Sequence, residues 1–219
     1  LIWYTYTDSQ DALWMATNAG IARVEIPRPL SYFNEQKGLR GIVYSVVRSQ
    51  GILYAATSRG VFYLDERNTE GIMFKKIAGI ASQSWHLLDI GNSLLVATNT
   101  GVYEIKNFAA NQITERLTYY LHSLNKDFSI ILSGLRNGIT LLNKNRGKWK
   151  ATGRIQVVDE ATMNIIEDKK GSLWMGTKYT GVLHINYSIQ TIENEQRFIV
   201  DHTEKFDTTN GDRKSTRLN

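Results

Sequence analysis

The sequence predicts an all-β protein made of repeated four-stranded units. Three observations support this prediction: an apolar run, a polar turn and a glycine recur five times, a strand-like alternation follows each glycine, and the spacing is regular. The turn glycines are Gly20, Gly60, Gly101, Gly138 and Gly181, at separations of 40, 41, 37 and 43 residues. A steady period near 40 residues is typical of stacked supersecondary units.

The second and third strands of each unit are predicted from the repeated core. Aligned on their glycines, the five copies are LWMATNAGI (13–21), LYAATSRGV (53–61), LLVATNTGV (94–102), ILSGLRNGI (131–139) and LWMGTKYTGV (173–182). The alternation of apolar and polar residues after the glycine, as in 182–186, indicates a strand. The glycine is expected to supply a backbone angle or a close approach that other residues resist.

The first and fourth strands are predicted on either side of this core. First-strand candidates are 43–47, 84–90, 119–124 and 162–168, and fourth-strand candidates are 72–78, 112–119, 147–155 and 196–202. Four short strands in about 40 residues match a β-propeller blade, in which antiparallel sheets pack face to face around an axis. A β-sandwich is the alternative, but it gives no reason for a signature at fixed spacing. Glycine and threonine inside the core runs disfavour a helical solenoid.

Residues that recur in every copy are predicted to build the blade. Trp14, Tyr54 and Trp174 occupy one equivalent position, and large aromatic side chains there are expected to pack between adjacent sheets. The threonines that end the core runs are expected to close a hydrogen bond at the turn. These threonines are Thr17, Thr57, Thr98 and Thr177.

The last copy shows a resemblance to a known family. Residues 167–186, EDKKGSLWMGTKYTGVLHIN, resemble the two-component regulator propeller repeat, whose pattern is approximately D-x-x-G-x-L-W-x-G-T-x-x-G. Residues 38–40 resemble the Gly-Leu-Pro that leads into its first strand. Copies three and four depart from the pattern, with Leu95 in place of tryptophan and Leu135 in place of threonine. The residues that match are Asp168, Gly171, Leu173, Trp174, Gly176, Thr177 and Gly181.

The resemblance implies a fragment of a receptor. Residues 1–211 are expected to form about five blades, near 1–38, 39–80, 81–117, 118–157 and 158–205, of an incomplete ring that usually closes with seven. The parent chain would be a membrane-anchored, dimeric hybrid histidine kinase. Its periplasmic propellers would bind a ligand such as an oligosaccharide and relay a conformational signal to neighbouring propeller and downstream domains. The alternatives are a propeller scaffold for protein–protein interaction and a propeller enzyme of the lyase or lactonase type.

Composition narrows the possible functions. The chain has no cysteine, which excludes disulfides, thiol catalysis and cysteine-based zinc sites. Its formal net charge is +5, but residues 212–219, DRKSTRLN, resemble a translated sequencing-library adapter and carry three positive charges and one negative charge. No basic run predicts a nucleic-acid partner, and no apolar run approaches the roughly 18 residues that span a bilayer.

The sequence predicts no catalytic residue, no metal site and no cofactor. Its four histidines fall in different repeats at different phases, and no pair has the spacing of metal ligands. Adjacent carboxylates on a strand point to opposite faces, so they cannot converge on one reacting atom.

Ligand contacts are instead expected where the copies differ, on loops at one mouth of the propeller. The turns between second and third strands and the links between blades are expected to open on the same face. Cations and aromatic rings mixed there would suit a polar or anionic ligand, such as an acidic oligosaccharide. Trp85 has a second interpretation as a core residue, because it begins an inner strand. The predicted ligand-binding residues are Arg40, Arg59, Trp85, Arg136, Lys178 and Tyr179.

Overall fold

Five four-stranded antiparallel sheets make up the fold, which confirms the all-β, blade-like architecture predicted from the sequence. The structure is a computed structural model and describes residues 1–9, 12–24, 31–66, 71–125, 127, 129–145, 147–155, 159–192, 195–207 and 209. The adapter-like tail lies outside these residues. The sheets fall into two compact units, Leu1–Thr118 (unit 1) and Tyr119–Asn219 (unit 2).

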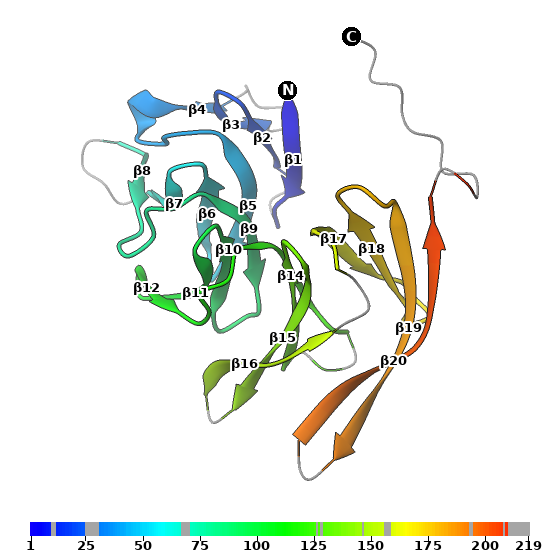
Figure 1. The fold of residues 1–219 in the computed structure, drawn as a ribbon. Coiled ribbons are helices and arrows are strands. Elements are labelled where there is room, and N and C mark those ends of the chain that lie inside the picture. Colours follow the sequence, from blue (N-terminus) through cyan, green and yellow to red (C-terminus); the bar gives the residue numbers. More distant parts are fainter. Residues whose placement is uncertain are drawn as a thin grey trace. The chain divides into compact units, whose positions relative to one another are not determined.

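Unit 1 holds three sheets whose strands follow one another in chain order. The first sheet is β1 (Ile2–Thr7), β2 (Leu13–Thr17), β3 (Gly20–Val24) and β4 (Ser31–Phe33). The second is β5 (Val43–Ser49), β6 (Ile52–Thr57), β7 (Gly60–Asp65) and β8 (Met73–Lys76), after a short 3-10 helix, η1 (Glu35–Lys37). The third is β9 (Ser84–Asp89), β10 (Leu94–Thr98), β11 (Gly101–Lys106) and β12 (Ala109–Gln112). The first strands β1, β5 and β9 are neighbours, whereas β4, β8 and β12 lie on the outside (Figure 1).

Unit 2 holds two sheets with the same order of strands. One sheet is β13 (Thr118–Ser123), β14 (Ile130–Leu135), β15 (Gly138–Asn145) and β16 (Lys148–Ile155). The other is β17 (Thr162–Glu167), β18 (Leu173–Thr177), β19 (Val182–Ile192) and β20 (Glu195–Phe206). With 11 and 12 residues, β19 and β20 form the longest hairpin among the described residues.

The hydrophobic core lies between neighbouring sheets. One cluster joins the first two sheets, a second joins the second and third, and a third joins the two sheets of unit 2. Trp14 is 1% exposed and stacks on Phe33, with ring centroids 5.9 Å apart. Its predicted packing role is therefore confirmed, and Tyr54 occupies the matching place in the second cluster.

A carboxylate before the core strand holds the tryptophan. The Trp14 indole donates from Nε1 to Oδ2 of Asp8 over 2.8 Å, and the backbone N–H of Ala12 donates to the other carboxylate oxygen. In the last sheet Trp174 makes the same bond to Asp168 over 3.2 Å. N–H donation, chiefly from the Ser172 backbone and then from the Trp174 indole, lowers the pKa of Asp168. The repeated aspartate therefore closes the first hairpin and orients the indole.

The repeated threonines close the next hairpin, as predicted. Each Oγ1 donates to the carbonyl of the following turn glycine, over 2.9 Å at Thr17, 3.0 Å at Thr57, 2.8 Å at Thr98 and 2.8 Å at Thr177. The hydroxyl also accepts a backbone N–H within the same turn. One side chain thus satisfies both a donor and an acceptor of the turn.

The turn glycines supply both an unusual backbone angle and a close approach of another segment, the two roles expected from the sequence. Gly20 and Gly101 have φ of +133°, which disfavours residues with a side chain. A Cβ atom at Gly101 would lie 1.7 Å from the carbonyl oxygen of Thr114, and one at Gly20 would lie 1.9 Å from that of Phe33. The glycines therefore allow the segment that ends each blade to pack against the central turn.

The predicted fourth strand of the third sheet, 112–119, is wrong. The fourth strand is Ala109–Gln112, and residues 113–115 are irregular. The reason is a tight turn directly after β11, in which Asn107 and Phe108 take φ of 50° and 61°. Asparagine tolerates this conformation but phenylalanine rarely adopts it, so the turn carried no glycine signal.

A buried polar cluster joins the two sheets of unit 2. Nε2 of His122 on β13 lies 3.7 Å from Oε2 of Glu167 on β17, whose side chain is 1% exposed. The other oxygen of Glu167 accepts the Tyr187 hydroxyl over 2.8 Å. Burial, partly opposed by Glu167, lowers the pKa of His122 below 6.5.

This cluster predicts a pH-dependent stability of unit 2. Because folding lowers the pKa of His122, the unfolded chain binds more protons between that pKa and 6.5, so the free energy of unfolding rises with increasing pH across this interval, and this stability is lost as the pH falls. We expect His122→Gln to flatten the dependence of the urea midpoint between pH 7 and pH 5. His202→Gln is the control, because His202 is exposed. If the urea midpoint depends equally on pH in the wild type and in His122→Gln, His122 is not the cause of the pH dependence.

Candidate functional site

The turns between second and third strands and the links between sheets are held together by hydrogen bonds. In the second sheet, Ser58 donates its backbone N–H to the carbonyl of Ile42 over 2.8 Å and accepts the N–H of Ile42 on its side chain over 3.0 Å. In the third, Asn99 donates its backbone N–H to Gln83 over 2.9 Å. We call these turns and links in unit 1, between β2 and β3, β4 and β5, β6 and β7, β8 and β9, and β10 and β11, the mouth.

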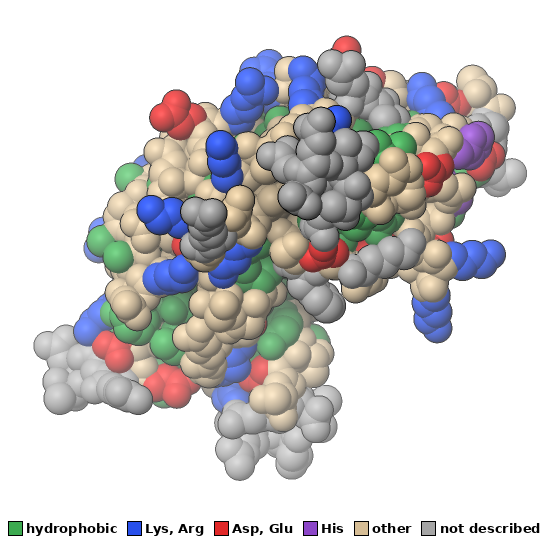
Figure 2. All heavy atoms as spheres, turned by 90° about the horizontal axis from the view of Figure 1, so that it is seen from below, with side chains coloured by type: hydrophobic (Ala, Val, Ile, Leu, Met, Phe, Trp, Pro, Cys, Tyr) green, Lys and Arg blue, Asp and Glu red, His purple; other side chains and the backbone are tan. Residues whose placement is uncertain are grey.

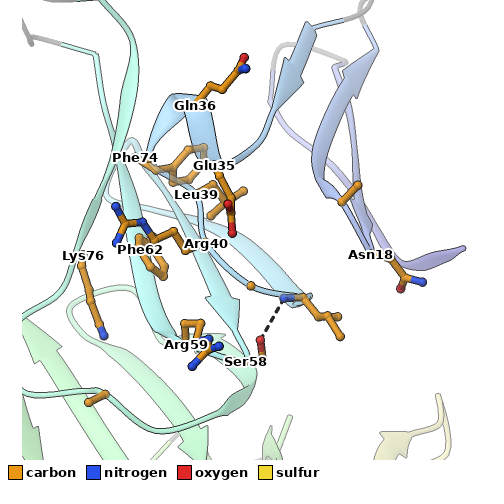
Figure 3. A pocket seen from close by; sticks show the side chains of 15 residues that line it. Asn18, Glu35, Gln36, Leu39, Arg40, Ser58, Arg59, Phe62, Phe74 and Lys76 are labelled. Carbon is orange, nitrogen blue, oxygen red and sulfur yellow. Dashed lines mark hydrogen bonds between the residues drawn. The ribbon is translucent and has the colours of Figure 1, made fainter.

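A hollow of about 1240 Å³ lies at this mouth. Its lining comes from the β2–β3 turn, the β4–β5 link, the β6–β7 turn, the β8–β9 link and the outer half of the second sheet. Figure 3 shows Phe62, Phe74 and Leu39 close together with polar side chains around them, and these three apolar side chains are buried. The hollow exceeds the roughly 300–1,000 Å³ of a typical small-molecule pocket, so it can accept part of an extended ligand.

Three cations line the hollow: Arg40 from the link, Arg59 from the turn and Lys76 from the end of β8. The charged ends of Arg59 and Lys76 point to the same side (Figure 3). Among the described residues none of the three forms an ion pair, and Glu35 is the carboxylate of the lining. The hollow is therefore suited to an anionic group, which arginine binds through charge-assisted hydrogen bonds.

Glycines place two of these side chains. Gly41 has φ of +89°, and a Cβ there would come within 2.9 Å of Cγ of Arg59. A Cβ at Gly60 would come within 3.0 Å of Cε of Lys76. Bare backbone under both stems allows the cations to lie against the turn. The sequence did not indicate Lys76, because it lies on an outer strand and not on a turn or link.

Trp85 lies beside the hollow, at the start of β9, and does not line it. Its side chain is half-buried, its Nε1 donates to Oδ1 of Asn99 over 2.8 Å, and its ring lies 4.8 Å from that of Tyr44. The core interpretation of Trp85 is therefore wrong, since the bulge that precedes His86 turns it to the mouth. Tyr44 was missed, although its spacing of 41 residues from Trp85 could have identified it.

The other three predicted residues form a separate group in unit 2. Lys178 follows β18, and its backbone N–H donates to Ala161 over 3.0 Å, which repeats the link seen in unit 1. Its Nζ lies 5.0 Å from the ring centroid of Tyr179, which is 77% exposed. Tyr179, the main cause, raises the pKa of Lys178, whereas nearby Arg136 lowers it. The six predicted residues thus form two groups, one in each unit.

Other features that would bear on function are a metal site, a basic surface and a membrane-spanning helix. Within the described ranges no three His, Cys, Asp or Glu residues gather as a metal site. On the face drawn in Figure 2, Lys and Arg side chains are separated by neutral surface and by carboxylates among the described residues. The described part of the chain holds no helix that is long and apolar enough to cross a bilayer.

Four-stranded antiparallel sheets whose strands follow one another in chain order, with neighbouring first strands in unit 1, have the pattern of β-propeller blades. No family model and no curated protein sequence matches the chain. Solved structures do match its fold. The extracellular domain of BT4673 from B. thetaiotaomicron, described as a hybrid two-component system, superposes with a TM-score of 0.65 at 18% identity, over 84% of this chain and 28% of that chain.

Two further structures show how widely the fold is used. The extracellular domain of BT3049, from the same organism and similarly described, has a TM-score of 0.67 at 16% identity, over 95% of this chain and 30% of that one. Virginiamycin B lyase from Staphylococcus aureus has a TM-score of 0.64 at 9% identity, over 95% and 71%. The chain spans less than a third of the two-component structures. At these identities the likeness establishes the fold.

Proposed function

We propose that this chain belongs to a sensor propeller of the two-component regulator propeller type, which binds an anionic ligand at the mouth of unit 1. The observation that carries the proposal is the hollow with Arg40, Arg59 and Lys76. The repeat at 167–186 and the fold shared with two-component extracellular domains support the receptor assignment. An acidic oligosaccharide is the ligand class that fits a large, cation-lined hollow.

In this proposal the parent receptor is membrane-anchored and dimeric, with the propeller in the periplasm and a hybrid histidine kinase downstream. Ligand binding transmits a signal only if the two states of the receptor bind the ligand with different affinity. The lining of the hollow comes from two sheets and the link to a third, so a shift of one sheet relative to another would alter the hollow. Neighbouring propeller and downstream domains are the proposed partners.

A propeller enzyme is the second candidate, and the fold shared with virginiamycin B lyase favours it. A lyase or lactonase needs general acid–base groups or a metal that converge on its substrate. The described lining of the hollow offers Glu35 as its carboxylate, next to cations. Turnover of a bound ligand by the purified chain would decide for the enzyme over the sensor.

The sensor proposal predicts a selective loss of binding. We expect Arg59→Ala to weaken binding of an acidic oligogalacturonate about 10- to 100-fold in titration calorimetry, the range for a charge-assisted hydrogen bond. Binding of the methyl-esterified oligomer, which lacks the charges, should not change in this variant. Lys150→Ala on the outer strand β16 is the control for a lost positive charge.

The Arg136→Ala variant tests the group in unit 2 in the same way. If Arg59→Ala binds the acidic oligomer with wild-type affinity, the hollow is not the ligand-binding site. Wild-type affinity in Arg136→Ala would remove the assignment in unit 2 and leave the hollow untouched.

A further inference from the structure

A β-bulge occurs at the same place in the first strand of each sheet of unit 1. In β1, Ile2 and Tyr4 pair with consecutive residues of β2, which leaves Trp3 unpaired in the ladder. Tyr44 is bypassed in the same way in β5 and Trp85 in β9. A bulge redirects a side chain and interrupts the hydrogen bonds between the two strands, and bulges are frequent beside functional sites.

The three bulged residues are aromatic and form a continuous row, which we call the aromatic ladder. Trp3 and Tyr44 make an edge contact with centroids 6.4 Å apart, and Tyr44 and Trp85 lie 4.8 Å apart with their planes inclined at 44°. The row crosses all three sheets of unit 1. Trp3 is 50% exposed, and none of the three belongs to a core cluster of the described residues.

Hydrogen bonds fix the polar edges of the ladder. The Trp3 indole donates to Oδ1 of Asn18, and the Trp85 indole donates to Oδ1 of Asn99 over 2.8 Å. The hydroxyl of Tyr44 accepts from Nε2 of Gln83 over 2.7 Å. The rings are therefore held in place before any ligand binds, which lowers the entropy lost on binding. Trp3 is half exposed and Tyr44 and Trp85 are partly buried, so a ligand would contact the exposed part of each ring.

The neighbouring charges indicate the chemistry of the occupant. Asn18, which accepts the Trp3 indole, also lines the hollow with Arg40 and Arg59, so ladder and hollow meet there. Aromatic rings alone could attract a cation, but the arginines repel one. A ligand with flat apolar ring faces and acidic groups fits both parts. Three rings in a row favour several linked rings over a single one.

We propose that Trp3, Tyr44 and Trp85 form a stacking platform for successive sugar rings of an acidic oligosaccharide whose carboxylates bind at the hollow. This inference rests on the proposed function and extends its site to two residues, Trp3 and Tyr44, that the turn and link pattern does not indicate. The ladder contributes affinity for ring faces, and the arginines contribute affinity for charge. The two contributions are separable by substitution.

The test uses the purified chain and titration calorimetry with oligogalacturonate and its methyl ester. We expect Trp85→Ala and Tyr44→Ala to weaken binding of both oligomers by a similar factor, about 3- to 10-fold each. Arg59→Ala should weaken binding of the acidic oligomer only. Tyr44→Phe keeps the ring and should bind almost as the wild type does. Phe108→Ala is the matched control, because Phe108 is 42% exposed and contacts Tyr63, at the turn between β11 and β12.

Each outcome has a distinct meaning. One outcome is that Trp85→Ala and Tyr44→Ala bind both oligomers as the wild type does, whereas Arg59→Ala binds the acidic oligomer more weakly. This outcome overturns the aromatic ladder as a binding platform and leaves the proposed function standing. Equal losses in Phe108→Ala also overturn the ladder, because they indicate a general loss of structure. If the wild type binds neither oligomer, or binds a single-ring aromatic acid more tightly, the oligosaccharide platform is rejected. Absence of binding also counts against the proposed function.

Discussion

Replacing Gly101 by alanine is expected to lower the free energy of unfolding by roughly 3 kcal/mol or more. Two costs combine: a φ of +133° that residues with a side chain rarely adopt, and a Cβ 1.7 Å from the backbone oxygen of Thr114. The contact is with backbone, so no side-chain rotation relieves it. Backbone N–H groups of Ile113 and Thr114 also bond to Val102, so any shift that relieves the contact disturbs them. Denaturant unfolding monitored by circular dichroism measures the loss.

Gly91→Ala is the matched control in the same sheet. Gly91 has φ of +81°, but no heavy atom lies within 4 Å of the position that its Cβ would take. It therefore isolates the backbone cost, about 1–2 kcal/mol for a left-handed residue. Equal destabilisation by the two substitutions would show that the close approach to Thr114 contributes nothing. That result would remove the packing explanation for the repeated glycine.

Replacing Trp14 by alanine is expected to destabilise unit 1 by about 3–5 kcal/mol, the range for loss of a large buried aromatic side chain. Trp14 is 1% exposed and packs in the cluster that joins the first two sheets. Its removal also leaves a cavity beside Phe33 and takes a donor from the buried carboxylate of Asp8. The loss should appear as a lower denaturant midpoint for unit 1.

Trp14→Phe separates the hydrogen bond from the packing. The ring is largely retained, but the Asp8 carboxylate, whose side chain is 1% exposed, loses the indole donor. A cost of about 1–3 kcal/mol is expected for this loss. Trp174→Phe is the comparison, because the Trp174–Asp168 bond is longer and its tryptophan is only half-buried. An effect at position 174 as large as that at 14 would contradict the burial argument.

Local features of the sequence were sufficient for most of the fold. Alternation after each glycine predicted the third strands, because successive side chains of a strand point to opposite faces. The continuous apolar runs predicted the second strands, because both faces of β6, β10 and β14 are buried. The threonine at the end of each run bonds within its own turn, so its role was also predictable. The fourth strand of the third sheet was not, since its turn depends on positive φ at Asn107 and Phe108.

The candidate site was predictable only in part. Arg40 and Arg59 were expected at the mouth because turns and links alternate with strands, and they do line one hollow. Lys76 was missed because an outer strand brings it there only after the sheet forms. Trp3 and Tyr44 were missed because a bulge shifts the alternation by one residue, so only the spacing of 41 residues between Trp3 and Tyr44, and again between Tyr44 and Trp85, marks them in the sequence.

By itself, the sequence determined the second and third strands, the turns between them and the five-fold repetition of a four-stranded unit. These depend on contacts within about 40 residues, where alternation, glycine and threonine act locally. The tertiary structure decided which side chains come together at the mouth: Arg40, Arg59 and Lys76 line one hollow, and Tyr44 packs on Trp85. Tyr44 and Trp85 come from separate sheets. Their contact depends on inter-sheet packing and on the bulges, neither of which a local pattern encodes.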